Sequence, residues 1–140
     1  MKSLDVLVKR WEAKGIEAFP PYSEAVIRAT SLEAGIEPSK DLVDLYHTIG
    51  GMEIPDNQLW CLWPLAVVDK RKSEANEFGV LFSDYLLDAW VYRVKPNDMD
   101  TSAVYVDYFD GKPPPLVAET LEQFFDKYVT NAERLLNEPR

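Results

Sequence analysis

Residues 80–109 read VLFSDYLLDAWVYRVKPNDMDTSAVYVDYF and contain three short runs rich in β-branched and aromatic residues. Such runs have the composition of β-strands, and we predict strands at residues 80–82, 87–94 and 103–109. The link at residues 96–102 carries turn-forming Pro, Asn and Asp, and so short a link favours antiparallel neighbours over a βαβ crossover. The stretch therefore predicts an antiparallel sheet.

The chain before this stretch has the apolar periodicity of helices. We expect a first helix with Ser3 as its cap, and a second helix between a Ser23 cap and Gly35. A third helix is expected to hold Pro38 in its first turn and to stop at Gly50-Gly51. Three short helices are thus predicted in the N-terminal third.

Two further elements are predicted on either side of the three strands. The run LWCLW at residues 59–63 has strand composition. Thr120 and Gln123 match a capping box for a C-terminal helix, whose apolar face would hold Leu121, Phe124, Phe125, Tyr128, Ala132, Leu135 and Leu136. Segregated helices and strands predict a single α+β domain over residues 1–140, with N-terminal helices and a C-terminal helix packed on an antiparallel sheet.

The composition limits the kind of partner. The chain carries 15 Lys and Arg against 24 Asp and Glu, a formal net charge of −9. Such a surface repels phosphate backbones, so nucleic-acid binding is disfavoured and a macromolecular partner is expected to be basic. The alternative is that acidity only maintains solubility. A single cysteine, Cys61, and apolar runs too short for a membrane span or signal peptide predict a cytoplasmic protein that does not bind membranes.

Residues with catalytic chemistry are few. His47 and Cys61 could form a dyad, but Cys61 lies in an apolar run, where an inert buried thiol is the commoner interpretation. The carboxylates of residues 98–100 and 107–110 could gather a hard cation, although turns explain them equally well. Neither a calcium loop nor a glycine-rich phosphate loop is present. We therefore expect no catalytic residues, no cofactor and no metal.

Strand alternation indicates where a protein partner could bind, because consecutive side chains point to opposite faces. One set of faces is aliphatic and suits helix packing, whereas the other would hold Asp88, Trp90 and Tyr92, and Tyr105, Asp107 and Phe109. Aromatic rings supply buried area and carboxylates pair with Arg or Lys, so we expect the second set to meet a cationic protein. The candidate partner-binding residues are Asp84, Tyr85, Asp88, Trp90, Asp107 and Phe109. The alternative assigns the rings to the core.

Four motifs in succession resemble the SUKH superfamily over about residues 16–130. They are PSKDLVDLYHTIGG at 38–51, LWCLW at 59–63, VLFSD at 80–84 and VAETLEQFFDKY at 117–128. Many members of that family carry Asn-Gly-Gly where this chain has Ile49-Gly50-Gly51, and glycines where it has Tyr85-Leu86-Leu87. The resemblance implies a non-enzymatic fold that bacterial polymorphic-toxin systems use to bind and block nuclease or other toxins.

The first functional hypothesis is therefore an immunity protein, whose acidic face covers a basic surface of a cognate polymorphic or contact-dependent toxin. A second hypothesis follows from the family's yeast regulator of cell-wall synthesis, and is a regulatory or scaffolding adaptor with a constitutive cellular partner. A third is a small enzyme that uses clustered carboxylates.

Overall fold

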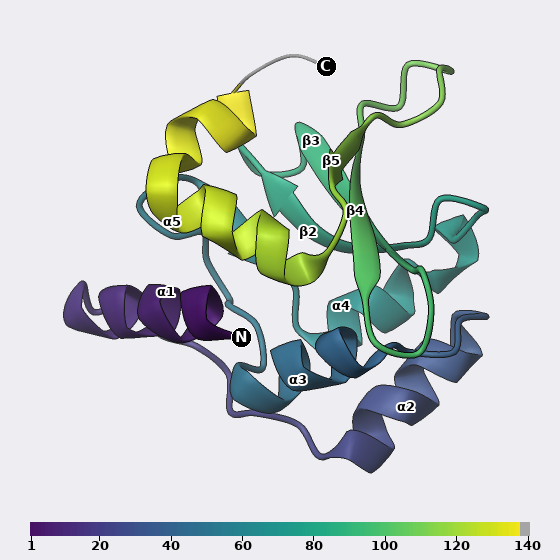
Figure 1. Cartoon of the computed structure of the whole chain (residues 1–140), viewed down its shortest axis with the longest axis horizontal. Helices are drawn as coiled ribbons and strands as arrows, with labels where there is room; N and C mark the ends of the chain where they lie inside the picture. Colours follow the sequence, from purple (N-terminus) through teal and green to yellow (C-terminus); the bar gives the residue numbers. More distant parts are fainter. Residues whose placement is uncertain (138–140) are drawn as a thin grey trace.

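The computed structural model describes residues 1–137, which form a five-stranded antiparallel sheet and the helices that cover it (Figure 1). The strands lie across the sheet in chain order, as β1 (Trp60–Leu62), β2 (Val80–Tyr85), β3 (Trp90–Pro96), β4 (Ser102–Asp107) and β5 (Leu116–Ala118). Each strand pairs antiparallel with the next. The predicted antiparallel sheet is therefore confirmed.

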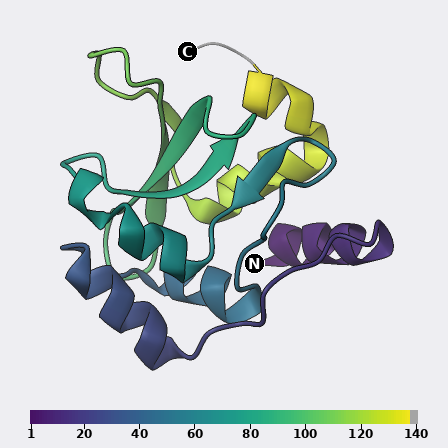
Figure 2. The same cartoon turned by 180° about the vertical axis from the view of Figure 1, so that it is seen from behind.

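The helices are α1 (Lys2–Ala13), α2 (Glu24–Glu33), α3 (Lys40–Thr48), α4 (Leu65–Lys70) and α5 (Leu121–Asn137), with a 3-10 turn at Lys72–Glu74. α5 lies across one face of the sheet with α1 packed beside it, and α2, α3 and α4 lie together below (Figures 1 and 2). This arrangement confirms the α+β class with N-terminal helices and a C-terminal helix on an antiparallel sheet.

Helix starts follow the local hydrogen bonds, which confirm some predicted caps and correct others. The Ser23 side chain accepts from the Val26 N–H at 3.3 Å, as predicted. Ser3 is not a cap, because α1 begins after Met1 and Ser3 lies inside the helix. Pro38 is not in the first turn of α3, whose N-cap is Ser39.

The register corrects the prediction of a shared aromatic and acidic face. Val91 lies opposite Asp107, and Tyr92 lies opposite Val106. Directly paired residues point to the same face of a sheet, so Tyr92 and Asp107 lie on opposite faces. The predicted strand at 87–94 also begins too early, because the chain turns before Trp90.

The core lies between α5 and the sheet, and its centre is Trp60 of β1. This side chain has no exposed surface, and its ring centroid lies 5.3 Å from that of Tyr128 and 5.8 Å from that of Phe124. The ring centroid of Phe124 in turn lies 5.8 Å from that of Tyr92 of β3. The apolar face predicted for the C-terminal helix therefore packs against the sheet as expected.

A buried carboxylate joins three elements around this core. Asp56 accepts hydrogen bonds from Trp11 Nε1 of α1 at 2.9 Å and from the Tyr128 hydroxyl of α5. Its other oxygen accepts from the backbone N–H groups of Gln58 at 2.8 Å and Trp60 at 3.1 Å. Burial, followed by the negative charge of Asp56, raises the pKa of Tyr128, so this hydroxyl stays protonated and donates. We refer to Asp56 and its four donors as the Asp56 clamp.

Candidate functional site

Backbone strain is concentrated at one end of the sheet. Within residues 1–137, five non-glycine residues have positive φ: Leu59, Leu86, Leu87, Asp88 and Phe109, with values from 50° to 75°. Each such residue costs about 1–3 kcal/mol relative to an ordinary conformation, and such residues cluster at functional sites. We call these five residues the sheet-end surface.

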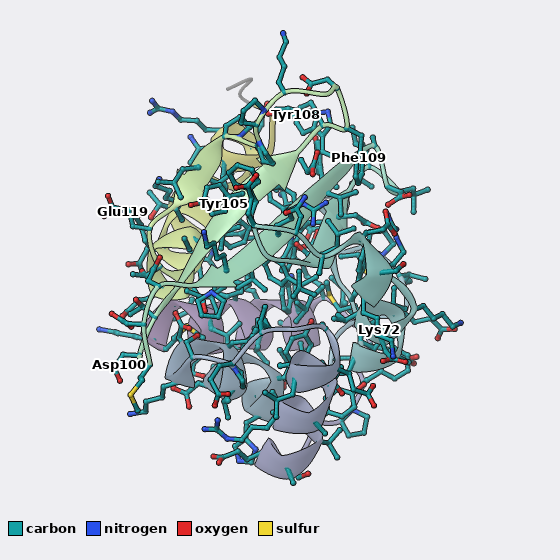
Figure 3. All side chains as sticks on the ribbon, turned by 90° about the vertical axis from the view of Figure 1, so that its right-hand side faces the viewer. Lys72, Asp100, Tyr105, Tyr108, Phe109 and Glu119 are labelled. Atoms are coloured by element: carbon teal, nitrogen blue, oxygen red, sulfur yellow. The ribbon has the colours of Figure 1, made fainter. Side chains whose placement is uncertain are left out.

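The pairing of the strands brings these five positions together. Trp60 pairs with Tyr85, so Leu59 lies beside Leu86, whose N–H donates to the Leu59 carbonyl at 3.0 Å. β4 ends at Asp107, opposite the start of β3, so Phe109 lies at the same end of the sheet. Figure 3 shows Tyr108 and Phe109 beyond Tyr105, at this end.

All five strained residues are exposed, and four of them are apolar, Asp88 being the charged one. Leu87 is 77% exposed, Phe109 53%, Leu59 49% and Leu86 42%. Exposed apolar side chains contribute little to folding, and grouped together they are typical of interaction sites. Glycine adopts positive φ without strain, whereas the leucines at 86 and 87 do not.

A row of three aromatic rings lies at the same end of the sheet. Tyr85 and Trp90 have ring centroids 5.3 Å apart, and Trp90 and Tyr108 have centroids 5.4 Å apart. Tyr85 is buried, whereas Trp90 and Tyr108 are half-buried. The three rings therefore pack against one another at the same end of the sheet as the strained turns.

Two carboxylates lie at the rim of this region. Asp88 is exposed and pairs with Arg71 at 3.4 Å, while Arg71 also pairs with Glu74 and lies over the Trp63 ring. Asp84 accepts from Trp63 Nε1 at 2.9 Å through one oxygen. Its other oxygen is buried without a hydrogen-bond partner, and burial raises the pKa of Asp84 against the opposing effect of the Trp63 hydrogen bond.

Asp107 has a structural role behind the surface. It is buried and forms an ion pair with Arg93 at 2.8 Å. Its second oxygen accepts from the Phe109 N–H at 2.8 Å, and Arg93 Nη1 donates to the backbone carbonyls of Glu74 and Gly79. These contacts fix the backbone at Phe109, so Asp107 positions the exposed ring instead of meeting solvent.

The structure thus brings the six predicted partner-binding residues to one end of the sheet, with unequal exposure. Asp88 and Phe109 are exposed, Asp84 and Trp90 are half-buried, and Tyr85 and Asp107 are buried. Sequence reasoning missed the three exposed leucines of this surface. The positive φ of Leu86 and Leu87 has no signal in the amino-acid sequence, because leucine rarely adopts this conformation.

The residues with catalytic chemistry are engaged elsewhere. His47 is exposed on α3 with Nδ1 3.0 Å from the Tyr22 carbonyl oxygen. Cys61 is buried, and burial, followed by the charges of Asp84 and Asp56, raises its pKa to about 12, so the thiol is not ionised at neutral pH. Asp98 accepts from the backbone N–H groups of Asp100 and Thr101, which closes a turn.

Comparison with protein-family models, curated proteins and solved structures finds no significant match to this chain. Across residues 1–137, no group of three or more His, Cys, Asp or Glu side chains has the arrangement of a metal site. In the same part of the chain, none of the helices combines the length and apolar composition required to cross a bilayer.

Proposed function

We propose that this chain is a non-catalytic protein-binding domain, an immunity protein of SUKH type that neutralises a toxin by covering it with the sheet-end surface. One observation carries the proposal. Four large apolar side chains are exposed at the same end of the sheet while their backbone is held at positive φ. Neither exposure nor strain stabilises the isolated fold, so a bound partner is the best reason for both.

The chemistry of the surface indicates how it would bind. Leu86, Leu87 and Phe109 supply exposed apolar area, and the half-buried rings of Trp90 and Tyr108 lie at the same end of the sheet. Asp88 at the rim can exchange its pairing with Arg71 for a cation of the partner. The net charge of −9 would steer a basic toxin domain toward the protein and speed the encounter.

Two further points support the immunity hypothesis. Three helices precede the first strand and one helix follows the last, as the resemblance to the SUKH superfamily implies, and α4 is an additional helix between β1 and β2. The four motifs behind that resemblance span the core, since they include Trp60 of β1 and Phe124 of α5.

The proposal is tested by co-expression with the product of the adjoining gene. We expect that product to inhibit growth alone, and this chain to restore growth and to copurify with it in a stoichiometric complex. A harmless neighbour would reject the immunity role and favour the regulatory or scaffolding adaptor, which could use the same surface. A toxic neighbour that stays unbound and fully active would reject it as well.

A further inference from the structure

The two edges of the sheet differ in accessibility. The outer edge of β1 is covered, because the Met52 N–H donates to Leu62 O and the Asp56 N–H donates to Trp60 O, both at 2.8 Å. β5 forms the other edge, and within residues 1–137 no further strand pairs with it. A sheet edge left open in this way is a template for an added strand.

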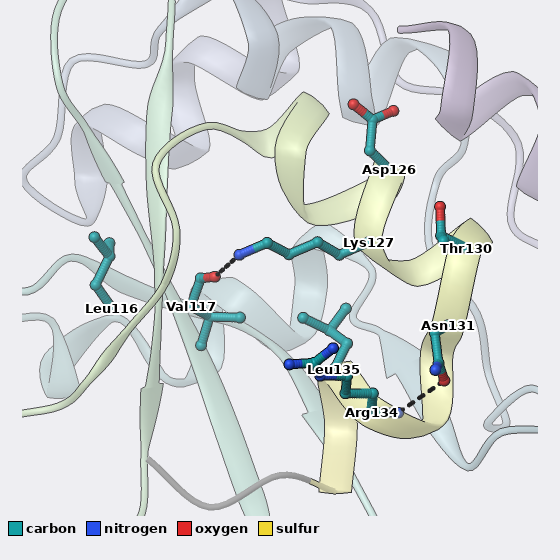
Figure 4. Close-up of a pocket in the computed structure, with 8 residues that line it drawn as sticks. All are labelled: Leu116, Val117, Asp126, Lys127, Thr130, Asn131, Arg134 and Leu135. Atoms are coloured by element: carbon teal, nitrogen blue, oxygen red, sulfur yellow. Dashed lines mark hydrogen bonds between the residues drawn. The ribbon is translucent and has the colours of Figure 1, made fainter.

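A groove of about 680 Å³ lies between β5 and α5 (Figure 4). Leu116, Val117 and Leu135 give it apolar surface. The groove lies where α5 is kinked at Asn131, whose φ of −159° and ψ of 83° are not helical. Asn131 Oδ1 accepts from the Arg134 N–H at 3.1 Å and so caps the last part of the helix.

The groove is cationic in an otherwise acidic protein. Two exposed cations, Lys127 and Arg134, line it together with one carboxylate, Asp126, which accepts from the Ser3 hydroxyl of α1 (Figure 4). The Lys127 ammonium donates to the Val117 carbonyl of β5 at 2.8 Å. This lysine therefore occupies the backbone acceptor that an added strand would use.

We propose that this groove binds an extended peptide segment of a partner protein in which acidic and apolar side chains alternate. An N–H of the peptide would take over the Val117 carbonyl, and the released Lys127 ammonium would pair with a carboxylate of the peptide. Arg134 lines the same groove and adds positive charge beside that pairing. Alternation then places the carboxylates on the side of α5 and the apolar side chains on the opposite side, where the exposed Leu116 lies on the same face as its partner Tyr105. The site uses residues that the sheet-end surface does not, so it stands independently of the proposed immunity function.

The test uses the full chain and two blocked peptides of about six residues, the usual strand length. One alternates valine and glutamate, and the other alternates valine and lysine. We expect the glutamate peptide to shift the backbone amide resonances of β5 and of residues 127–135, and the lysine peptide to leave them unchanged. Lys127→Met and Arg134→Met should each lower the affinity for the glutamate peptide about tenfold, since each removes a charge-assisted hydrogen bond.

Lys9→Met provides the matched control, since Lys9 is an exposed cation on α1. It should leave the affinity unchanged. The proposal is wrong if neither peptide binds at millimolar concentration, if both bind equally, or if the resonances that shift lie away from β5 and α5. Arg134→Met keeps the test valid should Lys127→Met expose the β5 edge and aggregate, because it leaves the bond between Lys127 and Val117 in place.

Discussion

Two aromatic regions of this molecule have similar composition and opposite surroundings. Around Trp60, the rings of Phe124, Phe125 and Tyr128 are sealed between α5 and the sheet, and Asp56 has four hydrogen-bond donors. At the sheet end, Tyr85 is buried, but the rings of Trp90 and Tyr108 that pack beside it are only half-buried. The first region is built to hold the fold together, whereas the second retains exposed leucines in a strained backbone.

The difference shows that aromatic content alone does not distinguish a core from an interface. What distinguishes them is coverage by α5 and the backbone conformation of the adjoining turns. Substitutions of the same type in the two regions should therefore have different effects on stability.

The largest difference is expected between two phenylalanines. Phe124→Ala should lower the free energy of unfolding by roughly 3–5 kcal/mol, because it empties a fully buried site. Phe109→Ala should lower it by less than about 1 kcal/mol, because its ring is half exposed. Urea denaturation of the two variants measures both values, and equal losses would remove the distinction between the regions.

The next largest effect is expected at the Asp56 clamp. Asp56→Ala should lower the free energy of unfolding by about 3 kcal/mol, since it leaves buried donors of α1, β1 and α5 without an acceptor. Amide exchange should report faster opening of α1, which is held through Trp11. A stable variant with α1 still protected would show that packing alone holds this helix.

A smaller effect of opposite sign is expected at the strained turn. Leu87→Gly should leave the free energy of unfolding unchanged or raise it by up to about 1 kcal/mol, because glycine adopts positive φ freely. Leu32→Gly is the matched control on α2, where the leucine is 56% exposed and helical, and it should cost about 0.5–1 kcal/mol. A loss of more than about 1 kcal/mol at Leu87 would mean that this side chain stabilises the fold.

The smallest effect concerns Asp84 and depends on pH. Its pKa is raised in the folded state, so ionisation of the carboxyl destabilises the fold at pH 7, and this destabilisation disappears as pH falls through the folded pKa toward the usual value of about 3.9. Asp84→Asn should therefore unfold at slightly higher urea concentration than the parent at pH 7, and the difference should shrink toward pH 4. A less stable variant at pH 7 would contradict this account.

Much of the fold could be predicted from the sequence, because helical periodicity and glycine stops are local signals. Helix α4 was missed because it has only six residues. Strand β5 was missed because it has only three residues and follows a run of prolines. The prediction that Asp88, Trp90 and Asp107 share one face of the sheet was wrong, because alternation determines the faces within one strand only. The relation between two strands depends on register, which the turn before Trp90 determines.

The candidate site was predictable in part. The acids and rings were found from composition, but positive φ at a leucine has no signal in the amino-acid sequence itself. At Leu59 and Leu86 it accompanies a hydrogen bond between residues far apart in the chain, from the Leu86 N–H to the Leu59 carbonyl.

The most direct test of the sheet-end surface compares two variants for binding to the toxin domain encoded beside this chain. Leu87→Ser with Phe109→Ser should lose at least about 100-fold in affinity, since it removes two apolar anchors, while the free energy of unfolding stays within about 1 kcal/mol of the parent. Leu32→Ser, on α2, should bind as the parent does. Unchanged binding by the double variant, or an equal loss in the α2 control, would contradict the assignment of this surface.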